Sequence, residues 1–496
     1  MQDFDFLAVR LPEDIRRLED IGDFKSAIKR IEKTLNSRLP LLLRRRLEYE
    51  LERINRVKKD YSIGKRKAVQ LLKKEIPNLT QKKFQNWVEN GYIDYRWVDG
   101  EERYFGRFIP NLFRFSSEAK SIRKKISDAK DQVAESVLNA QVEKICQSQF
   151  PEKYILPVKR RIKMRVSLKS NTVPDGEYVR CWLPFPRIGD QQTSVNLISS
   201  SPKNCILAPE DYPQRTIFFE QKVENTKPMV FEVEYEYITH ASYTGVFPNK
   251  VEPYDRDELY TKYTREHCPH ILFTSYLRNL ASEIIDKETN PYHKAWRIYD
   301  WITHNVKYAL TCEYSTYENI SEYVATNLQG DCGMQALLFI TLCRVSGIPA
   351  RWQSGWYINK FKASPHDWAQ FFIKPYGWLF ADASFGGHRV HDPKLHKFYF
   401  GNIDSFRLVC NSDILTQFTP TKKYVRSDPV DNQRGEMEWG EGNIYYDKFT
   451  YTMSGECEMW KVEGGDELLN YPMTIRPCDA MTLRLILLTG SQYVGK

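Results

Sequence analysis

The sequence predicts a multidomain α+β protein, because the chain is long and its residue pattern changes along its length. At 496 residues it exceeds what a single hydrophobic core usually holds. Apolar residues recur at helical spacing in the first 150 residues, whereas strict alternation of apolar and polar residues begins near Pro157. We therefore expect four parts: a helical module over 1–150, a β-sandwich over 151–250, a core of helices and strands with added strands over 251–465 and a C-terminal segment over 466–496.

The N-terminal module has helices followed by a hairpin. Ile15, Leu18 and Ile21 show the helical spacing of apolar residues, and Gly91 is placed to end a helix. Asp99-Gly100 lies between two aromatic runs, which predicts a hairpin near residues 92–105. Helix, turn, helix and hairpin in this order are typical of a winged-helix-like module.

The module also holds the basic excess of the chain. Residues 1–150 contain 32 Lys and Arg against 23 Asp and Glu, while the remainder contains 40 against 41. Nucleic-acid binding is one interpretation of this charge. Acidic residues are interleaved with the basic ones, so we favour a module that covers a cleft of the neighbouring core or grips a peptide, and we expect no nucleic-acid partner.

Short alternating strands predict the β-sandwich. Arg161–Leu168 alternates strictly between polar and apolar residues, and similar runs follow at Tyr178–Leu183 and Met229–Tyr237. We see no chemistry in this region. Two later strand-like runs, Gly435–Tyr446 and Phe449–Met453, are expected to add to the sheet of the core or to cover it.

The composition favours a cytoplasmic protein without a membrane partner. The first residues lack a basic segment followed by an apolar run, and no apolar stretch is long enough to span a bilayer. Ten cysteines without closely spaced pairs favour reduced thiols over a disulfide framework.

The candidate catalytic residues are Cys332, His366 and Asp382. Cys332 stands at a glycine turn directly before an apolar helix, where the partial positive charge of the helix N-terminus favours a thiolate. His366 and Asp382 lie in successive strand-like runs. An imidazole can take the proton of the thiol, and a carboxylate can hold that imidazole in the required tautomer. Other residues expected to shape the site or its oxyanion-binding region are Gly330, Asp331, Gly333 and Trp368.

These motifs give the chain a resemblance to a known family. Residues 276–408 resemble the core of the transglutaminase-like superfamily, in the order of the triad, in the run Leu342–Arg351 and in His-x-Trp at His366. The resemblance implies a papain-like core, in which the nucleophile helix packs on an antiparallel sheet. Two residues depart from the usual pattern. Gln335 replaces an aromatic residue or histidine, and Asp367 replaces a small residue and is expected to raise the pKa of the imidazole.

The resemblance implies thiol-dependent acyl transfer. We expect hydrolysis of an amide bond in a peptide or modified peptide through a thioester intermediate. A protein-glutamine transglutaminase, with an amine as acceptor, and a non-catalytic peptide-binding module are the alternatives. Water and amine acceptors use the same triad, so the motif does not separate the first two.

No cofactor or metal is expected. The sequence has no glycine-rich phosphate loop or dinucleotide fingerprint. His388, His391 and His396 could supply imidazole ligands to zinc, but their spacing suits no single helix face and Pro393 interrupts the run.

Overall fold

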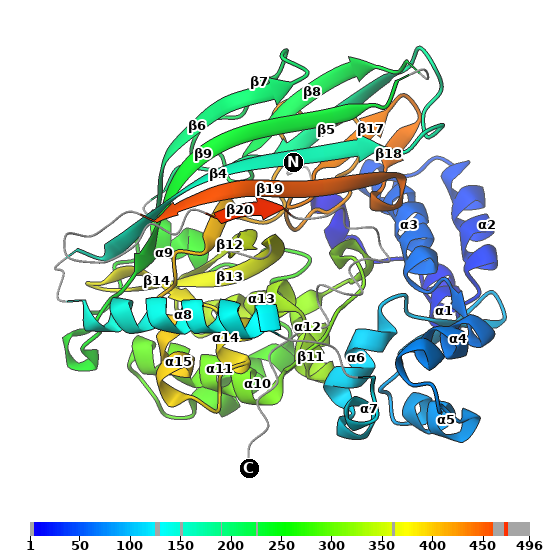
Figure 1. The fold of residues 1–496 in the computed structure, drawn as a ribbon. Helices are drawn as coiled ribbons and strands as arrows, with labels where there is room; N and C mark the ends of the chain where they lie inside the picture. The colour runs from blue at the N-terminus through cyan, green and yellow to red at the C-terminus, as the bar shows by residue number, and fades with distance from the viewer. Residues whose placement is uncertain are drawn as a thin grey trace. The chain divides into compact units, whose positions relative to one another are not determined.

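The computed structural model describes residues 4–124, 129–148, 152–189, 191–224, 227–359, 363–459 and 471–474. The chain, whose fold is drawn in Figure 1, consists of two compact units. Among the described residues, no helix combines the length and the apolar character needed to cross a bilayer. The smaller unit consists of Met1–Ser127, Cys268–His270 and Tyr308–Asn319, and the larger one of Asp128–His267, Ile271–Lys307 and Ile320–Lys496.

The smaller unit combines helices with a three-stranded sheet of order β1-β3-β2. Asp99 and Gly100 have φ angles of 52° and 86°, so the turn between β2 and β3 uses two left-handed residues, as an Asp-Gly pair allows. Assignment of this unit as a winged helix stays a prediction. Its elements are η1 (Asp5–Ala8), α1 (Glu13–Asp20), α2 (Phe24–Leu35), α3 (Leu41–Asp60), β1 (Ile63–Gly64), α4 (Lys65–Glu75), α5 (Gln81–Glu89), β2 (Tyr95–Val98), β3 (Glu101–Tyr104), α6 (Phe108–Phe115) and α7 (Ser117–Ser121).

Part of the basic charge of the smaller unit is neutralised inside its own fold. Glu50 is fully buried and pairs with both Arg46 and Arg53. Arg53 also pairs with Glu19, which is buried. A buried carboxylate requires such partners, because leaving one without them costs several kcal/mol, on the order of 3–5. These arginines therefore serve the fold, and nucleic-acid binding gains no support from them.

Two antiparallel five-stranded sheets of the larger unit share one hydrophobic core (Figure 1). Their orders are β20-β19-β4-β9-β6 and β18-β17-β5-β8-β7. Ile162 and Phe231 from the first sheet and Cys181 and Phe219 from the second are all fully buried in this core. The strands are β4 (Tyr154–Leu168), β5 (Tyr178–Pro184), β6 (Gln192–Ser201), β7 (Ile206–Leu207), β8 (Thr216–Lys222), β9 (Val230–Ser242), β17 (Glu436–Trp439), β18 (Gly442–Ile444), β19 (Phe449–Met459) and β20 (Tyr471–Thr474).

The strands that follow the core in sequence join these two sheets. Strand β17 pairs with β5, and β19 pairs with β4 along its whole length. The expectation that they add to the core sheet is therefore wrong. The alternative, that they cover it, agrees with the buried cluster in which Met437 and Met453 lie together with Trp356 of the core sheet. The apolar side chains of Met437 and Met453 enter the core shared by the two sheets, which determines where the strands pair. Of the C-terminal segment 466–496, all but residues 471–474 lie outside the described residues.

The core of the larger unit is a helix-covered antiparallel sheet of order β15-β14-β13-β12-β16. Helix α13 packs on β12 and β13, and its residues from Cys332 to Arg344 are all buried. The strands are β12 (Ala350–Ile358), β13 (Ala363–Ile373), β14 (Gly377–Ala381), β15 (Phe400–Gly401) and β16 (Arg407–Asn411), preceded by the short β10 (Lys307–Tyr308) and β11 (Gln329–Gly330). The helices are α8 (Ala129–Gln147), α9 (Glu258–Tyr263), α10 (Ser275–Ile285), α11 (Pro291–Asn305), α12 (Ile320–Asn327), α13 (Cys332–Val345), α14 (Ala383–Gly387) and α15 (Pro393–Phe398).

Candidate active site

The turn before Cys332 is built by a glycine and a capping carboxylate. A Cβ atom on Gly330 would lie 2.9 Å from Cβ of Met334, which is closer than real Cβ contacts come. Asp331 caps α13, and its Oδ1 accepts a hydrogen bond from Met334 N at 3.2 Å. Gln335, the departure noted in the sequence, donates to Gly330 O at 3.2 Å. These contacts hold the thiol at the start of the helix.

The thiol of Cys332 is buried and lies close to carboxylates. Its Sγ donates to Oδ2 of Asp367 at 3.3 Å, and the residue is 8% exposed. Gly333 follows it and is also buried. Burial, followed by the negative charges of Asp367 and Asp331, raises the pKa of Cys332 well above its ordinary value. In this arrangement burial and the carboxylates outweigh the helix N-terminus, and the thiol keeps its proton.

The imidazole of His366 lies in a network of matched charges. Its Nε2 is 2.7 Å from Oδ2 of Asp382, which is completely buried. Arg407 Nη1 donates to the same oxygen at 2.8 Å, and its Nη2 donates to Asp404 at 2.7 Å. Burial alone would raise the pKa of Asp382, but the charges of His366 and Arg407 hold it far below the usual range. Burial lowers the pKa of His366 more than the carboxylate raises it.

Aromatic rings fix the plane of the imidazole. Trp368 stacks on His366 with ring centroids 5.8 Å apart and an interplanar angle of 28°, and Phe385 lies 4.8 Å away. Trp368 is itself held by a hydrogen bond of 2.6 Å from its Nε1 to Gln353 Oε1. Since Nε2 of His366 faces Asp382, Nδ1 is the ring nitrogen left to act on a thiol.

In the structure, His366 is hydrogen-bonded to Asp382, as predicted for the triad. Cys332, however, is hydrogen-bonded to Asp367, and among the described residues no hydrogen bond links the thiol to the imidazole. The sequence predicts that Asp367 raises the pKa of His366. Burial is the largest influence on this pKa and lowers it, and the carboxylates that oppose burial are Asp382 and Asp404. Successive side chains of a strand point to opposite faces, so Asp367 of β13 reaches the thiol instead of its neighbour's ring.

A segment far downstream contributes residues that the sequence did not indicate. Gln433 Nε2 donates to Asp367 Oδ1 at 2.6 Å and to His366 O at 3.2 Å. Asp431 is 3% exposed and hydrogen-bonded to Asp367, and burial together with the charge of Asp367 raises its pKa well above the ordinary value. Two neighbouring buried carboxyls favour one shared proton. No pattern around 428–435 signals this role.

A comparison with protein families identifies the core. Residues 278–383, from α10 to the residue after Asp382, match the model of the transglutaminase-like superfamily. The chain therefore contains a transglutaminase-like domain, and the predicted resemblance is confirmed over residues 278–383. The matched range includes Cys332, His366 and Asp382, whereas Arg407 and Gln433 lie outside it.

Individual relatives are distant. An uncharacterised protein of Haemophilus influenzae is 25% identical over 248 residues, which is 43% of this chain and 66% of that protein. A candidate cysteine protease of Cytophaga hutchinsonii is similar at 17% identity and a TM-score of 0.41, covering 62% of this chain and 93% of the other. The periplasmic domain of TgpA from Pseudomonas aeruginosa is similar at 12% identity and a TM-score of 0.27, covering 51% of this chain and 94% of that domain. TM-scores this low carry no argument about this protein.

Proposed function

We propose that this protein is a cysteine-dependent acyl-transfer enzyme that hydrolyses an amide bond in a peptide or modified peptide. Cys332 is the nucleophile, His366 is the general base and acid, and Asp382 orients His366. The observation that carries the proposal is the contact of 2.7 Å between His366 Nε2 and the buried Asp382, which leaves Nδ1 for the thiol.

The proposed reaction has two steps. His366 accepts the proton of Cys332, and Sγ attacks the amide carbonyl carbon to form a C–S bond. The C–N bond then breaks, and the leaving nitrogen takes the proton from His366. His366 then deprotonates a water molecule, whose oxygen attacks the thioester carbon. The C–S bond breaks, and His366 returns the proton to Sγ, which releases the acid and regenerates the thiol of Cys332. The N–H of Cys332, at the first position of α13, has no partner within the helix and is the proposed oxyanion donor.

The described arrangement is a resting state of this mechanism. Sγ hydrogen-bonds to Asp367 and its pKa is raised, so attack requires Sγ to leave Asp367 and approach Nδ1 of His366. A rotation about χ1 of Cys332 is the smallest motion that moves Sγ without moving α13. Asp367 then acts as a restraint on the nucleophile.

A peptide assay tests the activity and its acceptor. We would incubate the full chain with a diverse peptide set, with and without a primary amine, and identify the products by mass. Cleaved peptides whose formation is lost in Cys332→Ala are expected. Cys343→Ala, a change on the same helix at a fully buried thiol, is the matched control. Amine-tagged products with little hydrolysis would identify the transglutaminase alternative.

One observation favours the non-catalytic alternative. The thiol of Cys332 is buried and its pKa is raised, which is the opposite of a reactive cysteine. A peptide-binding module with an inert thiol would leave every peptide of the set intact in wild type and in Cys332→Ala. It would also leave the alkylation rate of Cys332 unchanged when His366 is replaced. Both results together would reject the proposed enzyme.

A further inference from the structure

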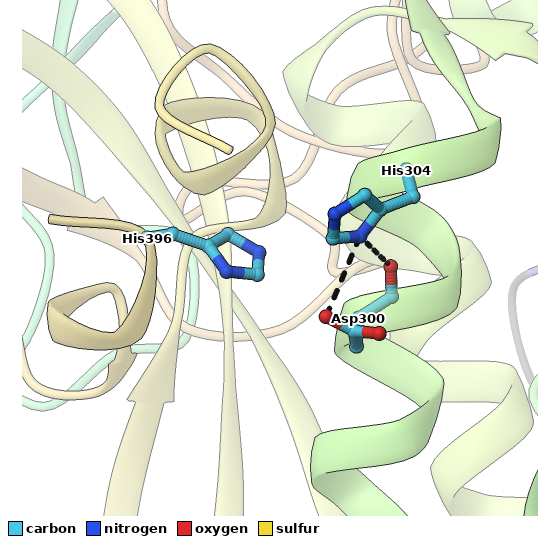
Figure 2. A group of neighbouring side chains, drawn as sticks. All are labelled: Asp300, His304 and His396. Carbon is cyan, nitrogen blue, oxygen red and sulfur yellow. Dashed lines mark hydrogen bonds and ion pairs between the residues drawn. The ribbon is translucent and has the colours of Figure 1, made fainter. Parts of the chain in front are cut away.

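A second group of potential ligands lies on the helices of the larger unit. Asp300 and His304 are on α11, and His396 is on α15. Their ligand atoms all lie within 4.8 Å of one another, and this is the one group of this kind among the described residues. Figure 2 shows the two imidazole rings turned toward each other, with the carboxylate of Asp300 below His304. None of the three residues takes part in the proposed acyl transfer.

The spacing of Asp300 and His304 on α11 places His304 for metal binding. Asp300 and His304 are four residues apart, so both side chains leave the same face of α11. His304 Nδ1 lies 2.8 Å from the backbone oxygen of Asp300 and 3.4 Å from its Oδ1. Metal-binding histidines commonly donate their second ring N–H to a carbonyl or carboxylate in this way, which fixes the tautomer. Nε2 of His304 is then the nitrogen with a free lone pair, and it faces His396 (Figure 2).

His396 is held rigidly opposite this pair. The residue is 6% exposed, and its ring stacks on Tyr299 with centroids 5.2 Å apart. Tyr299 also donates its hydroxyl to His396 O at 2.8 Å. Nε2 of His396 lies 2.9 Å from Thr303 Oγ1. A metal would replace Thr303 as the partner of this nitrogen, and the threonine hydroxyl would keep the backbone oxygens of Tyr299 and Asp300, each 3.0 Å away.

We propose that Asp300, His304 and His396 bind one Zn²⁺ ion. Two imidazoles and one carboxylate are a ligand set that zinc prefers, whereas calcium and magnesium prefer oxygen alone. Zinc ligands at about 2.0–2.1 Å from the ion lie roughly 3.4 Å apart, so the group must contract by up to about 1.4 Å. The half-exposed side chains of Asp300 and His304, at 46% and 50%, can rotate to do so and leave a fourth position for water.

The ion would tie α15 to α11. Helix α15 leads directly into Tyr399, whose backbone oxygen accepts from Asp382 N at 3.0 Å. Zinc would therefore stabilise the segment that returns the chain to the candidate active site, without touching the thiol. The proposal departs from our sequence-based expectation of no metal. It also differs from the three-histidine set, because His388 Nδ1 instead lies 2.6 Å from Ser384 O.

Cobalt substitution separates this site from the cysteines. We would measure Zn²⁺ bound per chain by equilibrium dialysis and record Co²⁺ absorption spectra on the full-length protein. Wild type should bind one ion and show visible d–d bands of tetrahedral cobalt without a thiolate charge-transfer band. His304→Ala should weaken binding by at least about tenfold. His293→Ala, at a half-exposed histidine of the same helix near Glu288, should bind like wild type.

Replacement of the exposed His304 is the decisive variant, because loss of the buried His396 could unfold α15. Zinc should also raise the Tm of wild type and of His293→Ala, but not that of His304→Ala. Equal Co²⁺ affinity in His304→Ala and wild type would overturn the proposal. A thiolate charge-transfer band from a single bound ion would overturn it as well, since that ion would sit on cysteine.

Discussion

The two halves of the candidate active site handle buried charge in opposite ways. Around His366, the buried carboxylates Asp382 and Asp404 share the guanidinium of Arg407, and the pKa of Asp382 is held far below its usual range. Around Cys332, the neighbouring groups are acids and an amide, and the pKa of the thiol is raised. At neutral pH, Asp382 in the first half is therefore ionised, whereas the thiol of Cys332 in the second half keeps its proton.

This difference places the thiol of Cys332 where its deprotonation is disfavoured. A thiolate beside Asp367 would add negative charge to a place that already holds one, and the raised pKa of Asp431 reflects the same crowding. The imidazole half offers the opposite environment, because the orientation of the ring is fixed and no hydrogen bond from a described residue engages Nδ1 of His366. Movement of Sγ between the two halves is the proposed switch from the resting to the reacting arrangement.

Among the substitutions around His366, Asp382→Asn should reduce turnover the most. The amide no longer favours the required tautomer of His366, so turnover of a cleaved peptide should fall by about 10³- to 10⁴-fold. Asp404→Asn is the matched control, because Asp404 shares Arg407 but does not touch the imidazole. Its turnover should fall far less at a comparable loss of stability, measured by urea unfolding. Equal loss of turnover in the two variants would mean that Asp382 acts only through the fold.

Arg407→Met should leave the buried carboxylates of Asp382 and Asp404 without the guanidinium that they share. Arg407 is completely buried between two carboxylates, so its loss should lower the free energy of unfolding by about 3–5 kcal/mol. Arg161→Met breaks the surface pair with Glu234, in which Arg161 is 45% exposed, and should cost less than about 1 kcal/mol. Urea unfolding of both variants measures the difference. Similar values would show that the buried network contributes no more than a surface ion pair.

Asp431→Asn should change how stability depends on pH. The pKa of Asp431 is raised in the folded state, so its contribution is complete below the unfolded pKa of about 4 and is lost as pH rises toward the folded value. Wild type should therefore lose stability relative to Asp431→Asn between about pH 5 and 8, by at most about 1.4 kcal/mol per pH unit. Urea unfolding at several pH values measures this slope.

Glu436→Gln is the control for that slope. Lys422 and Arg426 both contact Glu436, and although burial opposes them they lower its pKa to about 2. Its contribution is present above the unfolded pKa and is lost only as pH falls toward about 2, so the variant should keep the wild-type slope between about pH 5 and 8. A flattened slope in Glu436→Gln, or an unchanged one in Asp431→Asn, would contradict the assignment.

The sequence indicated the residues with local signatures and missed those that depend on distant pairing. Cys332 is marked by its glycine turn, and His366 and Asp382 by successive strand patterns, so all three could be named. Asp367 could be singled out from the sequence, but its hydrogen-bond partner could not, because that partner depends on which face of β13 packs against α13. Gln433 reaches the site through a loop path that no local pattern encodes.

The same limit applies to the fold. Alternation indicated strands near residues 161–168 and 449–453, because period-two burial is written in the sequence itself. Their pairing across about 280 residues of chain is fixed by side chains such as Met453 and Ile162 meeting in one core. Proximity in sequence wrongly suggested that the later strand would pair with a strand of the core sheet.

Alkylation of Cys332 tests most directly whether His366 activates the thiol and whether Asp367 restrains it. The rate with iodoacetamide near neutral pH would be measured by peptide mass in wild type, His366→Ala and Asp367→Asn, with Cys205 as the internal reference thiol. We predict that His366→Ala slows labelling of Cys332 and that Asp367→Asn speeds it, each by at least about tenfold relative to Cys205. Equal rates of Cys332 labelling in all three proteins would contradict both the proposed activation by His366 and the proposed restraint by Asp367.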